Sequence, residues 1–299
     1  MRIVEGKTAF ITGGGSGVGL GMARVFSDAG MKVVIADIRQ DHLDQAMATL
    51  KGKNDVHAIR LDVTDREAFA AAADEAERVF GKVHLVANNA GINLFNDMGD
   101  ATYDDWDWVL GVNLGGVVNG VQTFVSRIKA HGEGGHIVNT ASMASFISGA
   151  GAGIYTASKF AVRGLSEALR YSLAPHNIGV SVLNPGLVKS QIYESDLIRP
   201  EALSAHASKA PEAFMTMLAG LHQSGMEPVE VGEKVLKAVR NNDLYIFPHP
   251  EFRDELKELF DEALAAVPDE PVPEARLAFE KGRRASKDKA KAGFKDVGE

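Results

Sequence analysis

Short apolar runs rich in valine and isoleucine recur along the chain, and each is followed by a stretch with apolar residues at helical spacing. This alternation is typical of βαβ units, in which parallel strands form a sheet covered by helices on both faces. The first 250 of the 299 residues hold seven such runs without a visible boundary. The pattern therefore predicts one α/β domain with a doubly wound parallel sheet, which is Rossmann-like. The predicted strands are 8–12, 32–37, 56–61, 83–87, 136–140, 180–183 and 244–247.

Composition narrows the classes of function. The chain contains no cysteine, which excludes disulfides, thiolate nucleophiles and cysteine-ligated zinc. Its net charge of −8 argues against a nucleic-acid partner, because neutralising phosphates needs clustered lysine and arginine. The apolar runs are shorter than a membrane span, and the start of the chain lacks the pattern of a signal peptide. We therefore expect a cytoplasmic protein with no membrane partner.

One segment inside the domain departs from the alternation. Residues 186–230 lack a strand pattern and follow the sixth predicted strand. In an open α/β sheet the ligand binds outside the carboxyl ends of the strands, so this segment is a candidate substrate lid. The alternative is an ordinary helical excursion packed on the core.

The end of the chain, residues 251–299, forms an extension. Residues 251–267 carry apolar side chains three and four positions apart, which predicts an amphipathic helix. A proline-rich linker follows at 268–273. The basic stretch 276–299 has the composition of a solvated, poorly ordered end, and packing on a neighbouring subunit is the alternative.

A glycine-rich turn connects the first predicted strand to a helical pattern. Its sequence is Thr12-Gly13-Gly14-Gly15-Ser16-Gly17-Val18-Gly19. Glycines at 13, 17 and 19 let the backbone turn sharply and approach a pyrophosphate, while the start of the helix offers unpaired N–H donors. The spacing is Thr-Gly-x3-Gly-x-Gly rather than Gly-x-Gly-x-x-Gly. Between a first strand and a first helix, it indicates a dinucleotide site.

Asp37 ends the second predicted strand, 18 residues after Gly19. An acid there can bond both ribose hydroxyls of an adenosine and repels the additional phosphate of NADP. Ile38 supplies no cation, although Arg39 could reach a 2′-phosphate. The sequence therefore favours NAD. Asp62, after the third strand, is placed to touch the adenine, or it simply ends that strand.

Tyr155 and Lys159 lie four residues apart in a stretch with a helical pattern, so both side chains share one face. A phenol has a pKa near 10, but an adjacent ammonium and an oxidised nicotinamide both favour the phenolate. A tyrosine so placed can exchange a proton with an alcohol or a carbonyl.

Further motifs are Asn88-Asn89-Ala90-Gly91 after the fourth strand, Asn113 in Val-Asn-Leu-Gly-Gly, Ser142 after the fifth strand and Pro185-Gly186 after the sixth. Together with the glycine turn and the Tyr-Lys pair, this series resembles the short-chain dehydrogenase/reductase family over residues 5–250. The 13 residues from Ser142 to Tyr155 also match the family's pattern.

The resemblance implies four catalytic residues. Tyr155 would be the general acid/base, and Lys159 would lower its pKa and hold the nicotinamide ribose. Ser142 would bond the substrate oxygen, or it could merely cap a turn. Asn113 would hold a water on the proton path from Lys159, or it could satisfy helix backbone. Asn113 is surrounded by glycines that indicate either close packing or a break in the helix.

The resemblance also implies the cofactor contacts and no metal. The implied contacts are Gly13, Ser16, Gly17, Val18, Gly19, Asp37, Asp62, Val63, Asn89, Ala90, Gly91, Tyr155, Lys159, Pro185, Gly186, Val188 and Ser190. The family usually has threonine at the position of Ser190. A homodimer or homotetramer is implied as well, through the helices that contain Asn113 and Tyr155, where Gly115, Gly116 and Gly120 would permit close approach or pack inside the subunit.

A narrower resemblance rests on residues 36–43, 198–200, 225–228 and 244–251 and on the extended C-terminus. These segments look like the Cα-dehydrogenases of bacterial lignin β-aryl ether breakdown, which oxidise benzylic secondary alcohols to aryl ketones with NAD. The candidate pocket residues are bulky and apolar, which fits an aromatic substrate and equally fits ordinary packing. They are Leu94, Phe95, Met143, Phe146, Ile147, Leu187 and Tyr193.

The sequence thus predicts an NAD-dependent oxidoreductase acting on a bulky secondary alcohol or ketone. An NADP-dependent carbonyl reductase and a non-catalytic nucleotide-binding scaffold are the alternatives. A serine hydrolase is disfavoured because there is no Gly-x-Ser-x-Gly motif, and a zinc hydrolase because there is no His-Glu-x-x-His motif.

Overall fold

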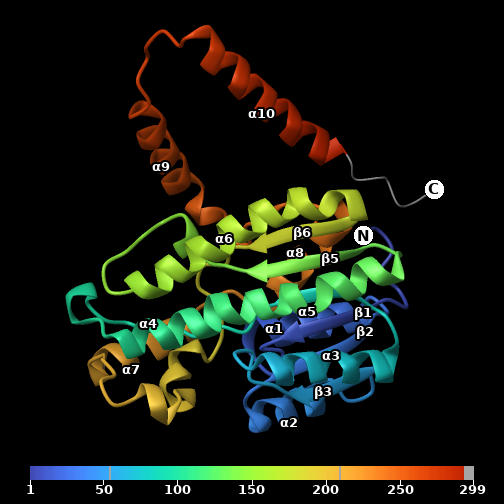
Figure 1. Cartoon of the computed structure of the whole chain (residues 1–299). Coiled ribbons are helices and arrows are strands. Elements are labelled where there is room, and N and C mark those ends of the chain that lie inside the picture. The colour runs from blue at the N-terminus through green and yellow to red at the C-terminus, as the bar shows by residue number, and fades with distance from the viewer. Residues whose placement is uncertain (54, 209, 293–299) are drawn as a thin grey trace.

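The computed structural model describes residues 1–53, 55–208 and 210–292. Seven parallel strands form one sheet in the order β3-β2-β1-β4-β5-β6-β7 (Figure 1). The strands are β1 (Thr8–Thr12), β2 (Lys32–Asp37), β3 (Val56–Arg60), β4 (Val83–Asn88), β5 (Gly135–Thr140), β6 (Ile178–Leu183) and β7 (Tyr245–Ile246). This confirms the predicted fold class, and each strand lies within two residues of its predicted bounds.

Helices cover both faces of the sheet, which explains the nearly continuous apolar strands. Every residue of β1, β4, β5 and β6 is buried. One core is closed by α1 (Gly17–Asp28), α2 (Gln40–Thr49) and α8 (Pro228–Asn241). The other is closed by α3 (Arg66–Phe80), α5 (Gly116–His131) and α6 (Gly153–Leu173).

A π-helical turn interrupts the long helix that crosses one face of the sheet. The helix runs from α4 (Tyr103–Leu110) through the turn at Gly111–Gly115 into α5. A Cβ on Gly116 would lie 2.7 Å from Val63 Cγ2, and one on Gly120 would lie 1.9 Å from Asn88 Oδ1. The glycines therefore serve both a local change of helix type and close packing, and Gly116 and Gly120 face the interior of the subunit.

The same helix, Tyr103–His131, is long and apolar enough by composition to cross a membrane, with a mean hydropathy of 1.2. Of its most apolar window, 44% is buried inside the domain. The core helix of a globular protein meets the same criterion, so this is weak evidence for a span.

Residues 186–230 lie at the carboxyl ends of the strands (Figure 1). They contain the 3-10 helices η5 (Ile192–Ile198) and η6 (Glu201–Leu203), then α7 (Glu212–Gln223), and no β-strand in their described part. The ion pair of Arg199 Nη1 with Asp105 Oδ1, 2.7 Å long and almost fully buried, ties this segment to α4.

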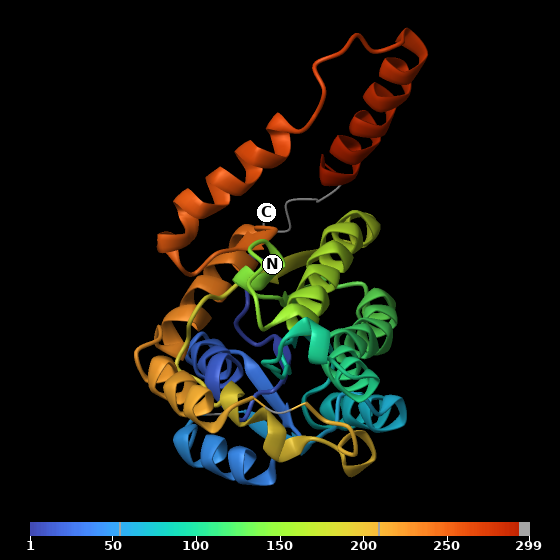
Figure 2. The same cartoon turned by 90° about the vertical axis from the view of Figure 1, so that its left-hand side faces the viewer.

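The C-terminal extension forms two helices, of which the first leads away from the domain and the second turns back toward α6, where Lys287 Nζ lies 5.2 Å from the centroid of the Tyr171 ring (Figures 1 and 2). The predicted amphipathic helix is present as α9 (Arg253–Ala265), after the short 3-10 helix η7 (Pro250–Phe252). The predicted poorly ordered end is wrong over most of its length, since α10 spans Glu274–Ala292. Alanine, lysine, arginine and glutamate favour helix, and Glu280 pairs with Arg283 and Arg284 one turn on. Residues 293–299 lie outside the described residues.

Candidate active site

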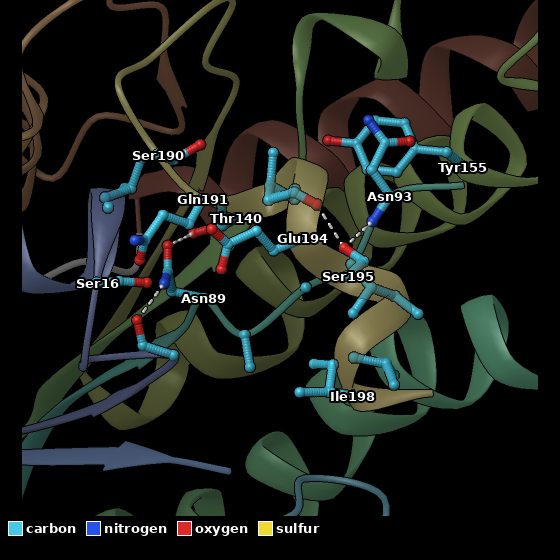
Figure 3. A pocket seen from close by; sticks show the side chains of 18 of the residues that line it. Ser16, Asn89, Asn93, Thr140, Tyr155, Ser190, Gln191, Glu194, Ser195 and Ile198 are labelled. Atoms are coloured by element: carbon cyan, nitrogen blue, oxygen red, sulfur yellow. Dashed lines mark hydrogen bonds between the residues drawn. The ribbon is translucent and has the colours of Figure 1, made fainter. Parts of the chain in front are cut away.

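A cavity of about 620 Å³ opens at the carboxyl ends of the strands. Its walls come from the glycine-rich turn, from the residues that follow β2, β4, β5 and β6, and from residues 186–230. Figure 3 shows Ser16, Asn89, Ser190 and Gln191 on one side of the view and Tyr155 on the other. The predicted motifs therefore meet around one cavity. This cavity lies where open α/β sheets bind ligands.

The glycine turn needs its glycines for backbone reasons. Gly13 and Gly17 have φ angles of +61° and +47°, in the region where side chains are strained. A Cβ on Gly13 would lie 2.9 Å from Ala90 Cα, and one on Gly19 only 2.0 Å from Gly13 O. Gly19 therefore packs the helix on the turn, and unlike the other predicted cofactor residues it does not line the cavity.

Hydrogen bonds join the turn to two other strand ends. Thr12 Oγ1 accepts from the backbone N–H groups of Asn89 and Ala90, at 2.9 and 3.1 Å. Asn89 Nδ2 donates to Thr12 O at 3.1 Å, and its Oδ1 accepts from Thr140 Oγ1 at 3.2 Å. The ends of β1, β4 and β5 are thus held in one fixed arrangement around the cavity.

Asp37 is held against the turn by two backbone donors. Its Oδ2 accepts from Gly15 N at 3.0 Å, and its Oδ1 accepts from Arg39 N at 3.1 Å. A Cβ on Gly15 would lie 2.9 Å from Asp37 Oδ2, so only glycine leaves room for this carboxylate. Asp37 lines the cavity.

Asp62 and Val63 line the same part of the cavity. Asp62 Oδ1 accepts from the backbone N and the Oγ1 of Thr64, at 2.9 and 2.8 Å, so the carboxylate also shapes its own turn. Val63 O accepts from Asn119 Nδ2 at 2.8 Å. Both residues are therefore fixed by hydrogen bonds at the cavity wall.

Tyr155 lies in the first turn of α6, and Lys159 follows one turn later, as predicted. Lys159 Nζ lies 5.4 Å from the centroid of the Tyr155 ring and donates to Thr140 O at 3.1 Å. Lys159 is only 3% exposed, and this burial lowers its pKa to about 8. The buried amine is thus held toward the phenol by a strand carbonyl.

Burial also raises the pKa of Tyr155, and a hydrogen bond with Ser142 opposes the rise. The sequence favoured a lowered pKa, but in the protein alone the cost of desolvating the phenolate is larger. An oxidised nicotinamide beside the ring would add a positive charge, which lowers the pKa of a phenol.

Ser142 caps a turn, which is one of the two roles that the sequence left open, and its bond to a substrate oxygen stays a prediction. Its Oγ accepts from Ala144 N at 3.1 Å and so caps the 3-10 turn η3 (Met143–Ser145). The same side chain lines the cavity and acts to lower the pKa of Tyr155 by hydrogen bonding. A substrate oxygen that bonds the Tyr155 hydroxyl would therefore also lie close to the Ser142 hydroxyl.

Asn113 lies in the π-helical turn, fully buried, and does not line the cavity. Its Oδ1 accepts from Ile92 N at 2.8 Å, and its Nδ2 donates to Ile92 O at 3.0 Å and Ser158 Oγ at 3.1 Å. A Cβ on Gly91 would lie 3.3 Å from both Asn113 Oδ1 and Lys159 Nζ. The Asn113 side chain is therefore hydrogen-bonded to the backbone of Ile92, and it also lies near the buried amine of Lys159.

The loop after β6 is fixed by two histidines that the sequence did not single out for a role. His249 Nδ1 accepts from Gly186 N, and its Nε2 donates to Leu187 O, both at 3.0 Å. His222 Nδ1 lies 2.9 Å from Val188 O and 3.3 Å from Ser190 Oγ. The only sequence signal for His249 was its place in the 244–251 segment, and His222 carried none.

Two of the seven candidate pocket residues, Phe95 and Leu187, line the cavity. Leu94, Met143 and Phe146 are buried in packing instead, Ile147 is half-buried outside the lining, and Tyr193 lies against His222. Further bulky apolar side chains of the lining are ones that the sequence did not single out. These are Trp108, Ile192, Ile198, Leu203, Leu218 and Phe252.

Comparisons with known proteins agree with this geometry. The family model "short chain dehydrogenase" matches residues 7–198. A C alpha-dehydrogenase from Sphingobium sp. strain SYK-6 is 44% identical over 277 residues, which cover 92% of this chain and 91% of that protein.

Two solved structures extend the comparison. A putative short-chain dehydrogenase from Novosphingobium aromaticivorans is 45% identical, with a TM-score of 0.84 and coverage of 99% of this chain and 100% of that one. A short-chain dehydrogenase/reductase from Burkholderia phymatum in complex with NAD is 35% identical, with a TM-score of 0.84 and coverage of 91% and 100%. The family resemblance drawn from the motifs is thereby confirmed, and this chain belongs to the short-chain dehydrogenase/reductase family of oxidoreductases.

Proposed function

We propose that this protein is an NAD-dependent dehydrogenase that interconverts a bulky, aromatic or alicyclic, secondary alcohol and its ketone. The observation that carries the proposal is the meeting of Tyr155, Lys159 and Ser142 in a cavity that also contains the glycine turn and Asp37. The first three residues supply proton transfer, and the last two supply a place for a dinucleotide.

The residues around the cavity fit a nicotinamide dinucleotide. The Ser16 side chain makes no capping hydrogen bond to α1, so the N–H groups at this helix start remain available to a pyrophosphate. Asp37 is fixed by backbone donors, with carboxylate lone pairs left for ribose hydroxyls. Bound NAD would supply the hydride acceptor for oxidation.

The chain's own residues would handle the proton. In alcohol oxidation the hydroxyl proton passes to the Tyr155 phenolate as the carbon-bound hydrogen leaves with its electron pair. Ser142 Oγ holds the substrate oxygen, and Lys159 favours the phenolate by its charge. Asn113, next to that amine, would hold a water on the way to solvent. In ketone reduction the phenol returns the proton.

The substrate end of the cavity favours an aromatic or alicyclic group. Phe95, Trp108, Ile198 and Leu218 contribute apolar surface there. Such a lining excludes water and stabilises a flat or bulky hydrocarbon skeleton. The similarity to a C alpha-dehydrogenase supports the aryl-substituted secondary alcohols over the alicyclic ones.

A panel of aryl and alicyclic secondary alcohols, followed by NADH absorbance, tests the proposal. We expect turnover of 1-aryl alcohols with NAD, at a kcat/KM above that for primary alcohols of the same size. Matched assays with NADP separate the second candidate, an NADP-dependent carbonyl reductase, which Arg39 in the cavity wall keeps open. Lack of turnover on every alcohol and ketone would support the alternative of a non-catalytic nucleotide-binding scaffold. The presence of Ser142, Tyr155 and Lys159 together argues against that alternative.

We also propose that residues 186–230 act as a substrate lid and that the protein is a cytoplasmic homodimer or homotetramer. Thirteen of the residues in 186–230 line the cavity, which supports the lid. The helices expected to form the interface expose large apolar side chains, with Val118 39% and Phe160 43% exposed. Light scattering at micromolar concentration is the test of assembly, and a monomer would contradict it.

A further inference from the structure

Arg39 has every nitrogen of its guanidinium engaged by a carboxylate. Its Nε and Nη2 donate to the two oxygens of Asp41, at 3.1 and 2.6 Å. Its Nη1 donates to Glu194 Oε2 at 2.7 Å. These bonds use three of the five N–H donors of the guanidinium and place two carboxylates against it, so another anion that approaches Arg39 is repelled by both acids.

The two acids come from different parts of the fold. Asp41 stands two residues from Arg39 in the first turn of α2, whereas Glu194 stands 155 residues away in η5 of the candidate lid. Arg39 and Glu194 both line the cavity, and Figure 3 shows Glu194 among its side chains. The ion pair therefore joins the lid to the wall that carries Asp37.

Few groups near Asp37 could hold a 2′-phosphate. Among the described residues that line the cavity, Arg39 and Lys159 are the only lysine or arginine side chains, and Lys159 is committed to Thr140 O beside Tyr155. The imidazole of His42 is the remaining nitrogen group on this wall. Discrimination between NAD and NADP thus depends on whether the Arg39 guanidinium is available.

We propose that Glu194 is a cofactor-discriminating residue, which keeps Arg39 from the 2′-phosphate of NADP and so enforces the preference for NAD. The inference rests on the proposed function and deepens it. Arg39 with Asp41, Glu194 and Asp37 carries a net charge of about −2, which repels a phosphate. Removing the charge of Glu194 halves that net charge and frees one edge of the guanidinium.

The position of Glu194 in the lid adds a second cost for NADP. A 2′-phosphate that captured Arg39 would break a contact that holds η5 over the cavity. NAD leaves this contact in place. Cofactor choice is therefore coupled to the lid, and Asp37 does not carry the preference alone.

The test measures binding, independently of turnover. Dissociation constants for NAD⁺, NADP⁺ and adenosine 2′,5′-bisphosphate are measured by titration calorimetry for the wild type and for Glu194→Gln. The control is Glu201→Gln, which removes the same charge from an exposed position of the same segment. The double variant Glu194→Gln with Arg39→Ala tests whether any gain passes through Arg39.

We expect Glu194→Gln to bind NADP⁺ and the bisphosphate at least tenfold more tightly than the wild type, with the affinity for NAD⁺ changed less than threefold. The gain should disappear in the double variant and be absent from Glu201→Gln. An unchanged NADP⁺ affinity, or an equal gain in the control or the double variant, would overturn the inference while leaving the dehydrogenase assignment intact. A wild type that binds neither dinucleotide would refute the proposed function and this inference together.

Discussion

At the scale of single residues, Lys159 is placed for chemistry at the expense of stability. Its ammonium is buried, and the pKa falls from 10.5 to about 8. The unfolded chain therefore binds more protons than the folded protein between these two values, so stability rises with pH across that window. Below pH 8 the shift corresponds to roughly 3 kcal/mol of destabilisation.

We expect Lys159→Met to lose most turnover and yet to unfold at a higher temperature at pH 7. The thermal gain should shrink between pH 8 and 10.5, because both states of the wild type then become neutral at this position. The loss of the bond to Thr140 O works against the gain. Calorimetric unfolding across pH checks this, with the solvent-exposed Lys51→Met as control; a variant less stable than the wild type at pH 7 would contradict it.

The sequence could predict the identity of the reactive side chains but not their electrostatics. Tyr155 and Lys159 follow from a four-residue spacing, which a helix converts into one face. The direction of the Tyr155 pKa does not follow from spacing, since it depends on how deeply α6 is buried beside Ser142. Asn113 shows the same limit, because its bonds to Ile92 require the π-helical turn.

At the scale of elements, the loop after β6 depends on the segment that follows β7. His249 satisfies both Gly186 N and Leu187 O, and Phe252 leaves no room for a side chain at Gly186. The C-terminal segment thereby positions the backbone beside Tyr155. This contact joins two loops that are far apart in the sequence, and the periodicity of the sequence does not predict it.

We expect His249→Ala to raise KM for both NAD and the alcohol and to lower kcat about tenfold, because the loop loses two backbone partners. The loss of two hydrogen bonds predicts a fall in unfolding free energy of about 1–3 kcal/mol. Steady-state kinetics and denaturant unfolding measure both effects. His176→Ala, on the surface, is the control, and wild-type kinetics in His249→Ala would show that the loop holds its shape without it.

The sequence predicts an element's type well where burial fixes the pattern of apolar residues. It predicts the type less well for a solvent-exposed helix such as α10. The strands β1, β4, β5 and β6 are buried on both faces, so their apolar runs give their positions within two residues. Residues 274–288 of α10, whose burial the structure describes, have no buried face, and the charge density of this helix resembles that of an unfolded tail. Its helix propensity was the available signal.

At the scale of the whole molecule, the sheet order brings distant segments to one edge. The glycine turn, the Asn89 region, Ser142 and the Pro185 loop follow β1, β4, β5 and β6, which are neighbours in the sheet. Parallel strands place all these segments at their carboxyl ends, and this is why motifs alone predicted the location of the site. The pairing of Arg39 with Glu194 needed the folded lid, since 155 residues separate them.

The proposed dehydrogenase mechanism depends most on proton transfer by the Tyr155 phenol. We expect Tyr155→Phe to bind NADH with a dissociation constant within threefold of the wild type, measured by nucleotide fluorescence. Turnover of the best secondary alcohol from the panel should fall by about 10²–10⁴-fold, the usual share of a general acid/base. Turnover within tenfold of the wild type, with NADH binding intact, would contradict the role given to Tyr155 and the mechanism built on it.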